Sequence, residues 1–184
     1  MSEAKVGEEF ITHELDEAIA IQRSIVTAEE SLGRDHPRPE AKRLIERSLK
    51  EDQKFLRDLE TLGRKHGATG KAEEVAGAMQ ELMTETSSKA TEAASEAYEA
   101  HAVLVNLKRK QQDSGAAMLK IARAMKDTEM RDAAMSFQKA TKASAQELAD
   151  ELAEFAVTIA TNGRSNGRSN GRSTSRTTAR AGGR

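Results

Sequence analysis

The sequence predicts an all-α protein, and three observations support this prediction. Proline occurs only at Pro37 and Pro39, both within one short joint. Outside the joints, Ala, Glu, Lys, Leu and Met dominate, and these residues lose little conformational freedom in a helix. No stretch shows the alternating, β-branched pattern of a strand. A chain of 184 residues is long enough for one domain with a hydrophobic core.

The first two predicted helices cover about residues 8–32 and 40–66. The joint "GRDHPRP", residues 33–39, separates them, because glycine ends helices and proline suits a first helical turn. Each helix carries an apolar stripe at helical spacing, which predicts the face that packs on the core. The first stripe consists of Ile11, Leu15, Ala18, Ile25 and Leu32, and the second of Leu44, Ile45, Leu49, Phe55, Leu56, Leu59 and Leu62.

The third helical region covers residues 71–111, after "GATG" has ended the second helix. As one helix it would be about 60 Å long and would overhang the first two. The Ser- and Thr-rich stretch "TETSSK", residues 84–89, is its weakest part, because clustered hydroxyls compete for backbone hydrogen bonds. We therefore expect a short crossing helix at 71–84 and the third long helix at 89–111.

The last helix is expected over residues 116–160, after a compact turn at "DSG", residues 113–115. A kink is expected within it near "KDTEM", residues 126–130. Its later apolar stripe consists of Phe137, Ala140, Ser144, Leu148, Leu152, Phe155 and Ile159. The predicted organisation is a helical bundle domain, 1–160, followed by a tail, 161–184.

The tail is expected to be disordered, because it has no apolar face and is rich in Gly, Ser and Thr. The chain has 29 basic and 30 acidic residues, but six of the basic ones are tail arginines, so residues 1–160 carry a net charge of about −7. The tail is either a flexible polycation for nucleic acid, an acidic assembly or anionic lipid, or a solubilising terminus without a partner. Its arginines are Arg164, Arg168, Arg172, Arg176, Arg180 and Arg184.

Composition excludes several kinds of chemistry. The absence of cysteine rules out disulfides, thiolate catalysis and Cys-ligated metals. No nucleophile–base pair or glycine-rich phosphate loop is present, so we expect no catalytic residues and no cofactor. "MSEAKVGEEF" lacks the pattern of a signal peptide, and no apolar run approaches the ~20 residues of a membrane span. We therefore expect a cytoplasmic protein.

Three stretches carry a resemblance to a known family. They are "RSLKEDQKFLRDLETLG" at 47–63, "AGAMQELMTE" at 76–85 and "AASEAYEAHAVLVNL" at 93–107. They resemble the second, connecting and third helices of the stress-associated YciE/YciF-type family of the ferritin-like superfamily. The resemblance implies a ferritin-like four-helix bundle, with a short crossing helix between its second and third helices and a dimetal carboxylate site inside it.

The ligand pattern of such a dimetal site is incomplete in this chain. It requires Glu-x-x-His on two helices, and none of the four histidines has a glutamate three residues before it. We therefore expect no metal centre. If metal does bind, the candidate ligands are Glu17, Glu51, Glu96 and Asp127.

Two polar residues stand out on apolar faces. Asp52 is either a remnant of a ligand set or a carboxylate at the edge of the helix seam that reaches water or pairs with a lysine. His101 is either a ligand or a hydrogen-bonded residue at the core boundary. The methionines at helical spacing are expected to fill gaps in the core.

The expected function is that of a non-enzymatic, stress-associated or structural bundle whose tail tethers it to a polyanion or larger assembly. A first alternative is a ferritin-like protein that binds metal or handles iron. A second is a phasin-like coat or scaffold protein, because "KATKASAQELADELAEFAVTIA", residues 139–160, is long, alanine-rich and amphipathic. The helical faces could also support a homo-oligomer.

Overall fold

A computed structural model of the protein describes residues 3–70 and 93–168. Within these two ranges the chain forms four helices and no strands, which confirms the all-α prediction. The predicted crossing helix, 71–84, lies outside the described residues. The four helices are α1 (Glu3–Asp35), α2 (Pro39–Lys65), α4 (Ala93–Met125) and α5 (Thr128–Arg168).

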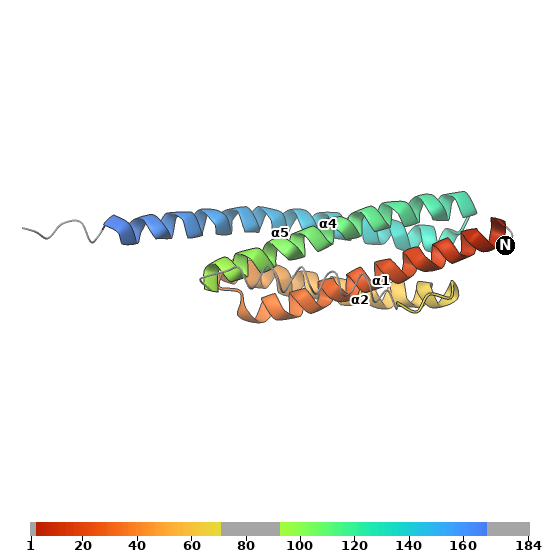
Figure 1. Ribbon diagram of the computed structural model, residues 1–184, viewed down its shortest axis with the longest axis horizontal. Helices are drawn as coiled ribbons and strands as arrows, with labels where there is room; N and C mark the ends of the chain where they lie inside the picture. The colour runs from red at the N-terminus through yellow and green to blue at the C-terminus, as the bar shows by residue number, and fades with distance from the viewer. Residues whose placement is uncertain (1–2, 71–92, 169–184) are drawn as a thin grey trace, which may run out of the picture.

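The helices pack as an elongated four-helix bundle. α1 lies against α2 and α4, and α5 lies against α4 and α2. Figure 1 shows that α1 and α5 run in one direction and α2 and α4 in the other, so each helix is antiparallel to both of its neighbours. Because α2 and α4 run the same way, the end of α2 and the start of α4 lie at opposite ends of the bundle.

The apolar core consists of two clusters of buried side chains. All five residues of the predicted α1 stripe are buried, and Ile45, Leu59 and Leu62 of the α2 stripe are buried with them. One cluster is built around Leu15, Met118 and Phe137, and the other around Ile25, Leu104 and Leu148. Polar side chains occupy the level between these clusters, and they form the site described below.

The turn between α4 and α5 does not lie where the sequence predicted it. The expected turn at 113–115 is wrong, because α4 continues through it to Met125. Gly115 is buried in the helix, and a Cβ atom there would lie only 3.0 Å from Cδ1 of Phe137. The glycine therefore permits close packing of α4 on α5, and it does not form a turn.

The real turn lies at Lys126 and Asp127, where only a kink was expected. Lys126 adopts a left-handed conformation (φ 60°), its N–H donates to the carbonyl of Arg123 at 3.3 Å, and the Asp127 N–H donates to the carbonyl of Ala122 at 2.9 Å. This pair of bonds is a Schellman helix end. Asp127 Oδ1 then accepts the N–H of Met130 at 2.9 Å and caps α5. The two motifs together reverse the chain direction.

The last helix extends beyond its predicted end at residue 160. α5 ends at Arg168, and the Thr161 hydroxyl donates to the carbonyl of Val157 one turn earlier. Arg164 and Arg168 therefore belong to the helix, while residues 169–184 lie outside the described part of the chain. Figure 1 shows the C-terminal part of α5 projecting beyond the ends of the other helices.

We predict that Gly115→Val lowers the free energy of unfolding by about 1–3 kcal/mol, because the new side chain must displace Phe137. Gly7→Val is the matched control, since Gly7 is an exposed glycine of α1 with no atom within 4 Å of a built Cβ. The control should change stability by less than about 1 kcal/mol. Urea denaturation followed by circular dichroism measures both, and equal effects would contradict the packing role of Gly115.

Candidate functional site

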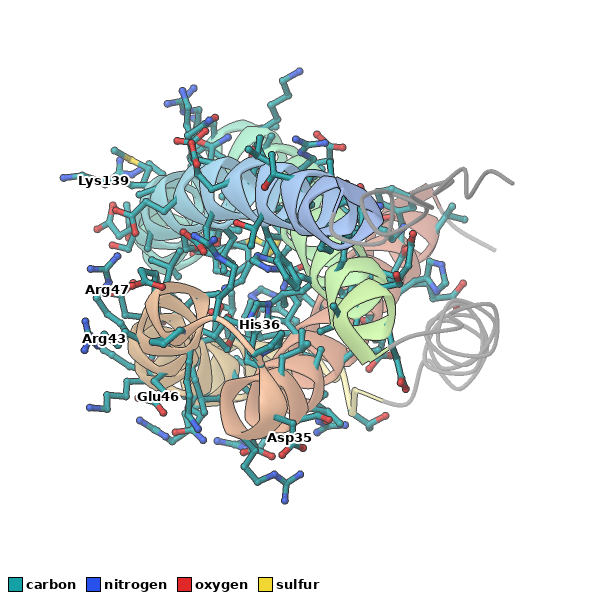
Figure 2. The ribbon with its side chains drawn as sticks, turned by 90° about the vertical axis from the view of Figure 1, so that its left-hand side faces the viewer. Asp35, His36, Arg43, Glu46, Arg47 and Lys139 are labelled. Atoms are coloured by element: carbon teal, nitrogen blue, oxygen red, sulfur yellow. The ribbon has the colours of Figure 1, made fainter. Side chains whose placement is uncertain are left out.

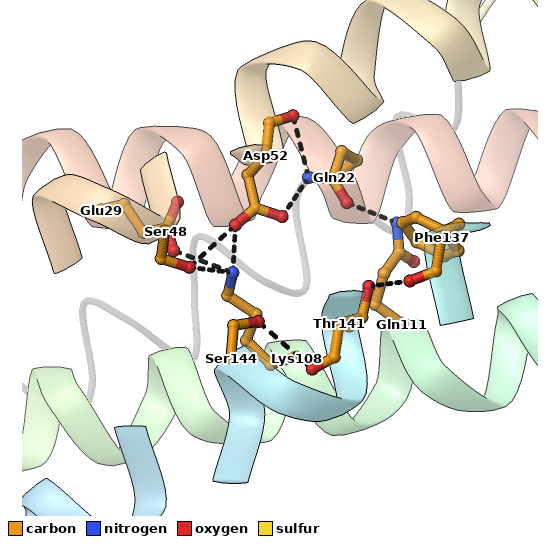
Figure 3. Close-up of polar contacts among 9 residues, drawn as sticks. All are labelled: Gln22, Glu29, Ser48, Asp52, Lys108, Gln111, Phe137, Thr141 and Ser144. Carbon is orange, nitrogen blue, oxygen red and sulfur yellow. Dashed lines mark hydrogen bonds and ion pairs between the residues drawn. The ribbon is translucent and has the colours of Figure 1, made fainter. Parts of the chain in front are cut away.

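A cluster of six polar side chains, here called the polar centre, lies inside the bundle (Figure 3). Each is at most 4% exposed, which is unusual for charged and amide side chains. α1, α2 and α4 each contribute two of them at helical spacing, so each pair lies on one helix face. The six residues are Gln22, Glu29, Ser48, Asp52, Lys108 and Gln111.

Lys108 connects three helices within the polar centre. Its Nζ donates to Ser48 Oγ at 2.7 Å, forms an ion pair with Asp52 Oδ2, and lies 2.9 Å from Glu29 Oε1. Ser48 and Asp52 belong to α2, which is diagonally opposite α4 in the bundle. The lysine stem thus crosses the interior and brings its positive charge to carboxylates on α1 and α2.

Gln22 completes the hydrogen bonding of Asp52, and Gln111 in turn bonds to Gln22. Gln22 Nε2 donates to Asp52 Oδ1 at 2.7 Å and to its backbone carbonyl at 3.2 Å. Gln111 Nε2 donates in turn to Gln22 Oε1 at 2.9 Å and to the carbonyl of Ala18 at 3.1 Å. Because Ser48 Oγ also donates to Asp52 Oδ2 at 3.1 Å, both carboxylate oxygens of Asp52 accept hydrogen bonds. Such a carboxylate can be buried in its charged form.

Glu29 is held differently from Asp52. Glu29 pairs with Lys108, but burial disfavours the charged form of its carboxyl group. No hydrogen bond within the described residues reaches the Oε2 atom of Glu29. Burial raises the pKa of Glu29 to about 8, with Lys108 lowering the value and the charge of Asp52 adding to the increase. At neutral pH Glu29 is therefore mainly protonated. The positive charge of Lys108 is then balanced by Asp52 alone, which leaves the polar centre electrically neutral.

A pair of buried histidines lies near one end of the bundle. The backbone N–H of Arg38 donates to His36 Nδ1 at 3.2 Å, so a neutral His36 carries its proton on Nε2, which lies 3.3 Å from His101 Nδ1. Burial lowers the pKa of His36, and burial followed by the charge of His36 lowers the pKa of His101 to about 4. Both rings are therefore neutral at pH 7. Their contribution to stability is lost as the pH falls below about 6.5, and for His101 this loss continues to about pH 4.

The structure does not bring the four candidate metal ligands together. Glu17 forms an ion pair with Lys110 at 2.8 Å, and Glu51 and Glu96 are exposed. Asp127 caps α5, and its Oδ2 lies 3.5 Å from His66 Nε2. Across residues 3–70 and 93–168, no group of three or more His, Asp or Glu side chains is arranged to hold a metal ion.

Only part of the polar centre was predicted from the sequence. Asp52 was singled out, and the lysine pairing expected for it is observed, although the residue is 3% exposed and does not lie at a water-facing edge. For His101, the hydrogen bond expected of a non-ligand is observed with His36, but the residue is fully buried and does not lie at the core boundary. Lys108 was missed, although it follows Leu104 by four residues and therefore lies on the same apolar face. Polar residues on an apolar stripe were the available signal, as with Gln22 between Ala18 and Ile25.

The candidate polyanion-binding arginines lie at the far end of α5 or beyond it. Arg164 and Arg168 fall within the helix, and the other four belong to residues 169–184.

No family model, curated protein or solved structure matches this chain. Among the described helices, none combines the length and apolar character needed to cross a membrane.

We predict that Glu29→Gln stabilises the protein increasingly as the pH rises. The native state holds the Glu29 proton up to about pH 8, whereas the unfolded chain releases it near pH 4.5, so this group's stabilising effect is lost across that interval. Glu29→Gln does not lose stability in this way. By pH 9 its free energy of unfolding should exceed that of the parent protein by the order of a few kcal/mol.

The matched control is Glu30→Gln, which changes the neighbouring, exposed glutamate. Its free energy of unfolding should follow that of the parent protein across the pH range. Urea denaturation from pH 5 to pH 9 measures all three proteins. If the Glu29→Gln advantage is independent of pH, Glu29 is not protonated in the native state.

Proposed function

We propose that this chain is a non-enzymatic, stress-associated or structural cytoplasmic bundle whose arginine-rich C-terminal segment tethers it to a polyanion or larger assembly. One observation carries the proposal: the C-terminal part of α5, which contains Arg164 and Arg168, projects beyond the bundle (Figure 1). That body, residues 1–160, carries a net charge of about −7 and repels polyanions. The projection gives the cationic segment access to a partner that the body itself would reject.

The interior of the bundle supports a role without catalysis. The amine of Lys108 is engaged by Ser48, Asp52 and Glu29, so its charge is balanced within the protein. His36 and His101 face each other with both rings buried. Such groups stabilise the arrangement of the helices, and the surfaces open to a partner are those on the outside of the bundle.

We further propose that the bundle is ferritin-like, with a crossing helix between α2 and α4. The helix directions support this, because a ferritin-like bundle has one long crossover connection. Here α2 ends at the opposite end of the bundle from the start of α4 (Figure 1), so one long connection is required. The resemblance to the YciE/YciF-type family, over 47–63 and 93–107, supports the same architecture.

The metal-binding alternative has an obstacle at the polar centre. A metal ion between the carboxylates of Glu29 and Asp52 would have to displace the ammonium of Lys108, which already pairs with both. We therefore predict that elemental analysis of purified protein finds no stoichiometric iron or manganese. Two tightly bound equivalents per chain would overturn this prediction and favour the ferritin-like metal protein.

The phasin-like alternative requires an apolar stripe that is free to coat a surface. Within residues 139–160, Leu148 and Phe155 are buried in the bundle. Val157 is 58% exposed, but it is a single side chain. The packing of this stripe favours a self-contained bundle.

The tether is tested by replacing all six C-terminal arginines with glutamine. Full-length protein should bind duplex DNA without sequence preference, with log K falling against log salt at a slope of about −5 if all six engage. The six-glutamine variant should lose this binding, because the acidic body repels phosphates. Substitution is preferable to truncation, since α5 continues to Arg168.

A matched control removes six exposed cations of the body and keeps the tail. DNA affinity should fall little in this control, and both proteins should retain the melting temperature of the parent. Absence of binding by the full-length protein to DNA, RNA and polyphosphate at low salt would contradict the tether, as would binding that survives in the six-glutamine variant. The control positions are Arg43, Lys50, Lys54, Arg57, Arg64 and Arg109.

A further inference from the structure

The α4–α5 pair carries a groove of about 610 Å³ that contains none of the six residues of the polar centre. The apolar part of its lining, here called the apolar floor, consists of Ala116, Leu119 and Met135, and Gln112 and Gln138 line the groove as well. Met135 is 49% exposed, although methionine is usually buried. Three cationic side chains line the same groove, namely Arg123, Lys139 and Lys142.

The three cations of the groove are not neutralised by the part of the chain that the structure describes. No ion pair there involves Arg123, Lys139 or Lys142, whereas other surface cations are paired, as Lys110 is with Glu17 at 2.8 Å. One acidic residue, Asp113, also lines the groove. Figure 2 shows Lys139 pointing away from the bundle into open space. The groove thus carries a local positive charge on an acidic body.

The combination of charge and apolar floor selects among anionic partners. Proteins that bind single-stranded nucleic acid stack its bases on aromatic side chains, and the groove lining contains none. Polyphosphate carries negative charge, but it has no apolar part that could cover Leu119 and Met135. An anionic lipid offers both, because its headgroup can meet the cations while its acyl region covers the apolar floor. Basic residues flanking apolar side chains are the general pattern of interfacial membrane binding.

We propose that the α4–α5 groove binds the surface of anionic lipid membranes. Arg123, Lys139 and Lys142 contact the headgroups, and Met135 inserts at the headgroup–acyl boundary beside Leu119, which packs on the core. The protein lies on the membrane surface in this arrangement and does not span it. The inference does not depend on the C-terminal arginines, since the groove lies on the bundle itself.

The test measures cosedimentation of full-length protein with phosphatidylcholine vesicles that contain phosphatidylglycerol, with pure phosphatidylcholine vesicles as the reference. The groove triple variant Arg123→Gln/Lys139→Gln/Lys142→Gln should bind roughly a hundredfold more weakly than the parent. The matched control Arg43→Gln/Lys50→Gln/Arg57→Gln removes the same charge from exposed positions of α2, and it should bind nearly as well as the parent.

A second pair of variants tests the apolar floor without changing any charge. Met135→Gln should weaken vesicle binding roughly fivefold to tenfold, because an inserted apolar side chain is lost. Val157→Gln alters another exposed apolar residue of α5, outside the groove, and should leave binding unchanged. All of these positions are exposed, and melting temperatures are compared to verify that each variant is folded.

Three outcomes would overturn the groove proposal. They are absence of binding to the anionic vesicles, equal losses in the two triple variants, and no effect of Met135→Gln. If the groove triple variant loses affinity for duplex DNA as strongly as it loses affinity for vesicles, the groove is a nucleic-acid surface instead. The tether is judged separately: if the full-length protein binds no DNA while vesicle binding depends on the groove, the tether fails and the groove proposal stands.

Discussion

A buried lysine ammonium must be neutralised and hydrogen-bonded, and the arrangement of α1, α2 and α4 depends on meeting that requirement. Lys108 reaches from α4 to Ser48 and Asp52 on the diagonally opposite helix and to Glu29 on α1. Sliding α2 or α4 by one turn would separate the charges of Asp52 and Lys108, which water cannot reach, at a cost of several kcal/mol. Apolar stripes alone tolerate such slippage more readily, so the polar centre favours one register.

The fourth helix is held by other means. Thr141 and Ser144 of α5 lie beside the polar centre, but their hydroxyls donate to the backbone carbonyls of Phe137 and Thr141 on the same helix (Figure 3). α5 is positioned by its close approach to α4 at Gly115 and by the Arg38–Glu151 ion pair at 2.6 Å. The two sites for which we propose partners, the projecting end of α5 and the α4–α5 groove, both lie on the outside of the bundle.

Helical segments and their core faces could be predicted well, whereas the last turn could not. Ile11, Leu15 and Ile25 are buried as their spacing indicated. The glycine in "DSG" suggested a turn, but a glycine can also permit close packing of two helices. The position of Phe137 against Gly115 shows that packing is its role, and this contact joins residues that lie on different helices. The turn instead uses Lys126 in a left-handed conformation, which costs a non-glycine residue energy that the following Asp127 cap helps to offset.

The sequence by itself determined the all-α class, the core faces, the contrast between an acidic body and a cationic C-terminal segment, and the exclusion of cysteine chemistry, because these follow from composition and local periodicity. The tertiary structure decided that Lys108, Glu29 and Asp52 meet, that His36 faces His101, and that the four candidate metal ligands lie apart. Those pairings join residues that lie far apart in the sequence. A polar residue on an apolar stripe shows that it needs a partner, but the partner is chosen by how the helices pack.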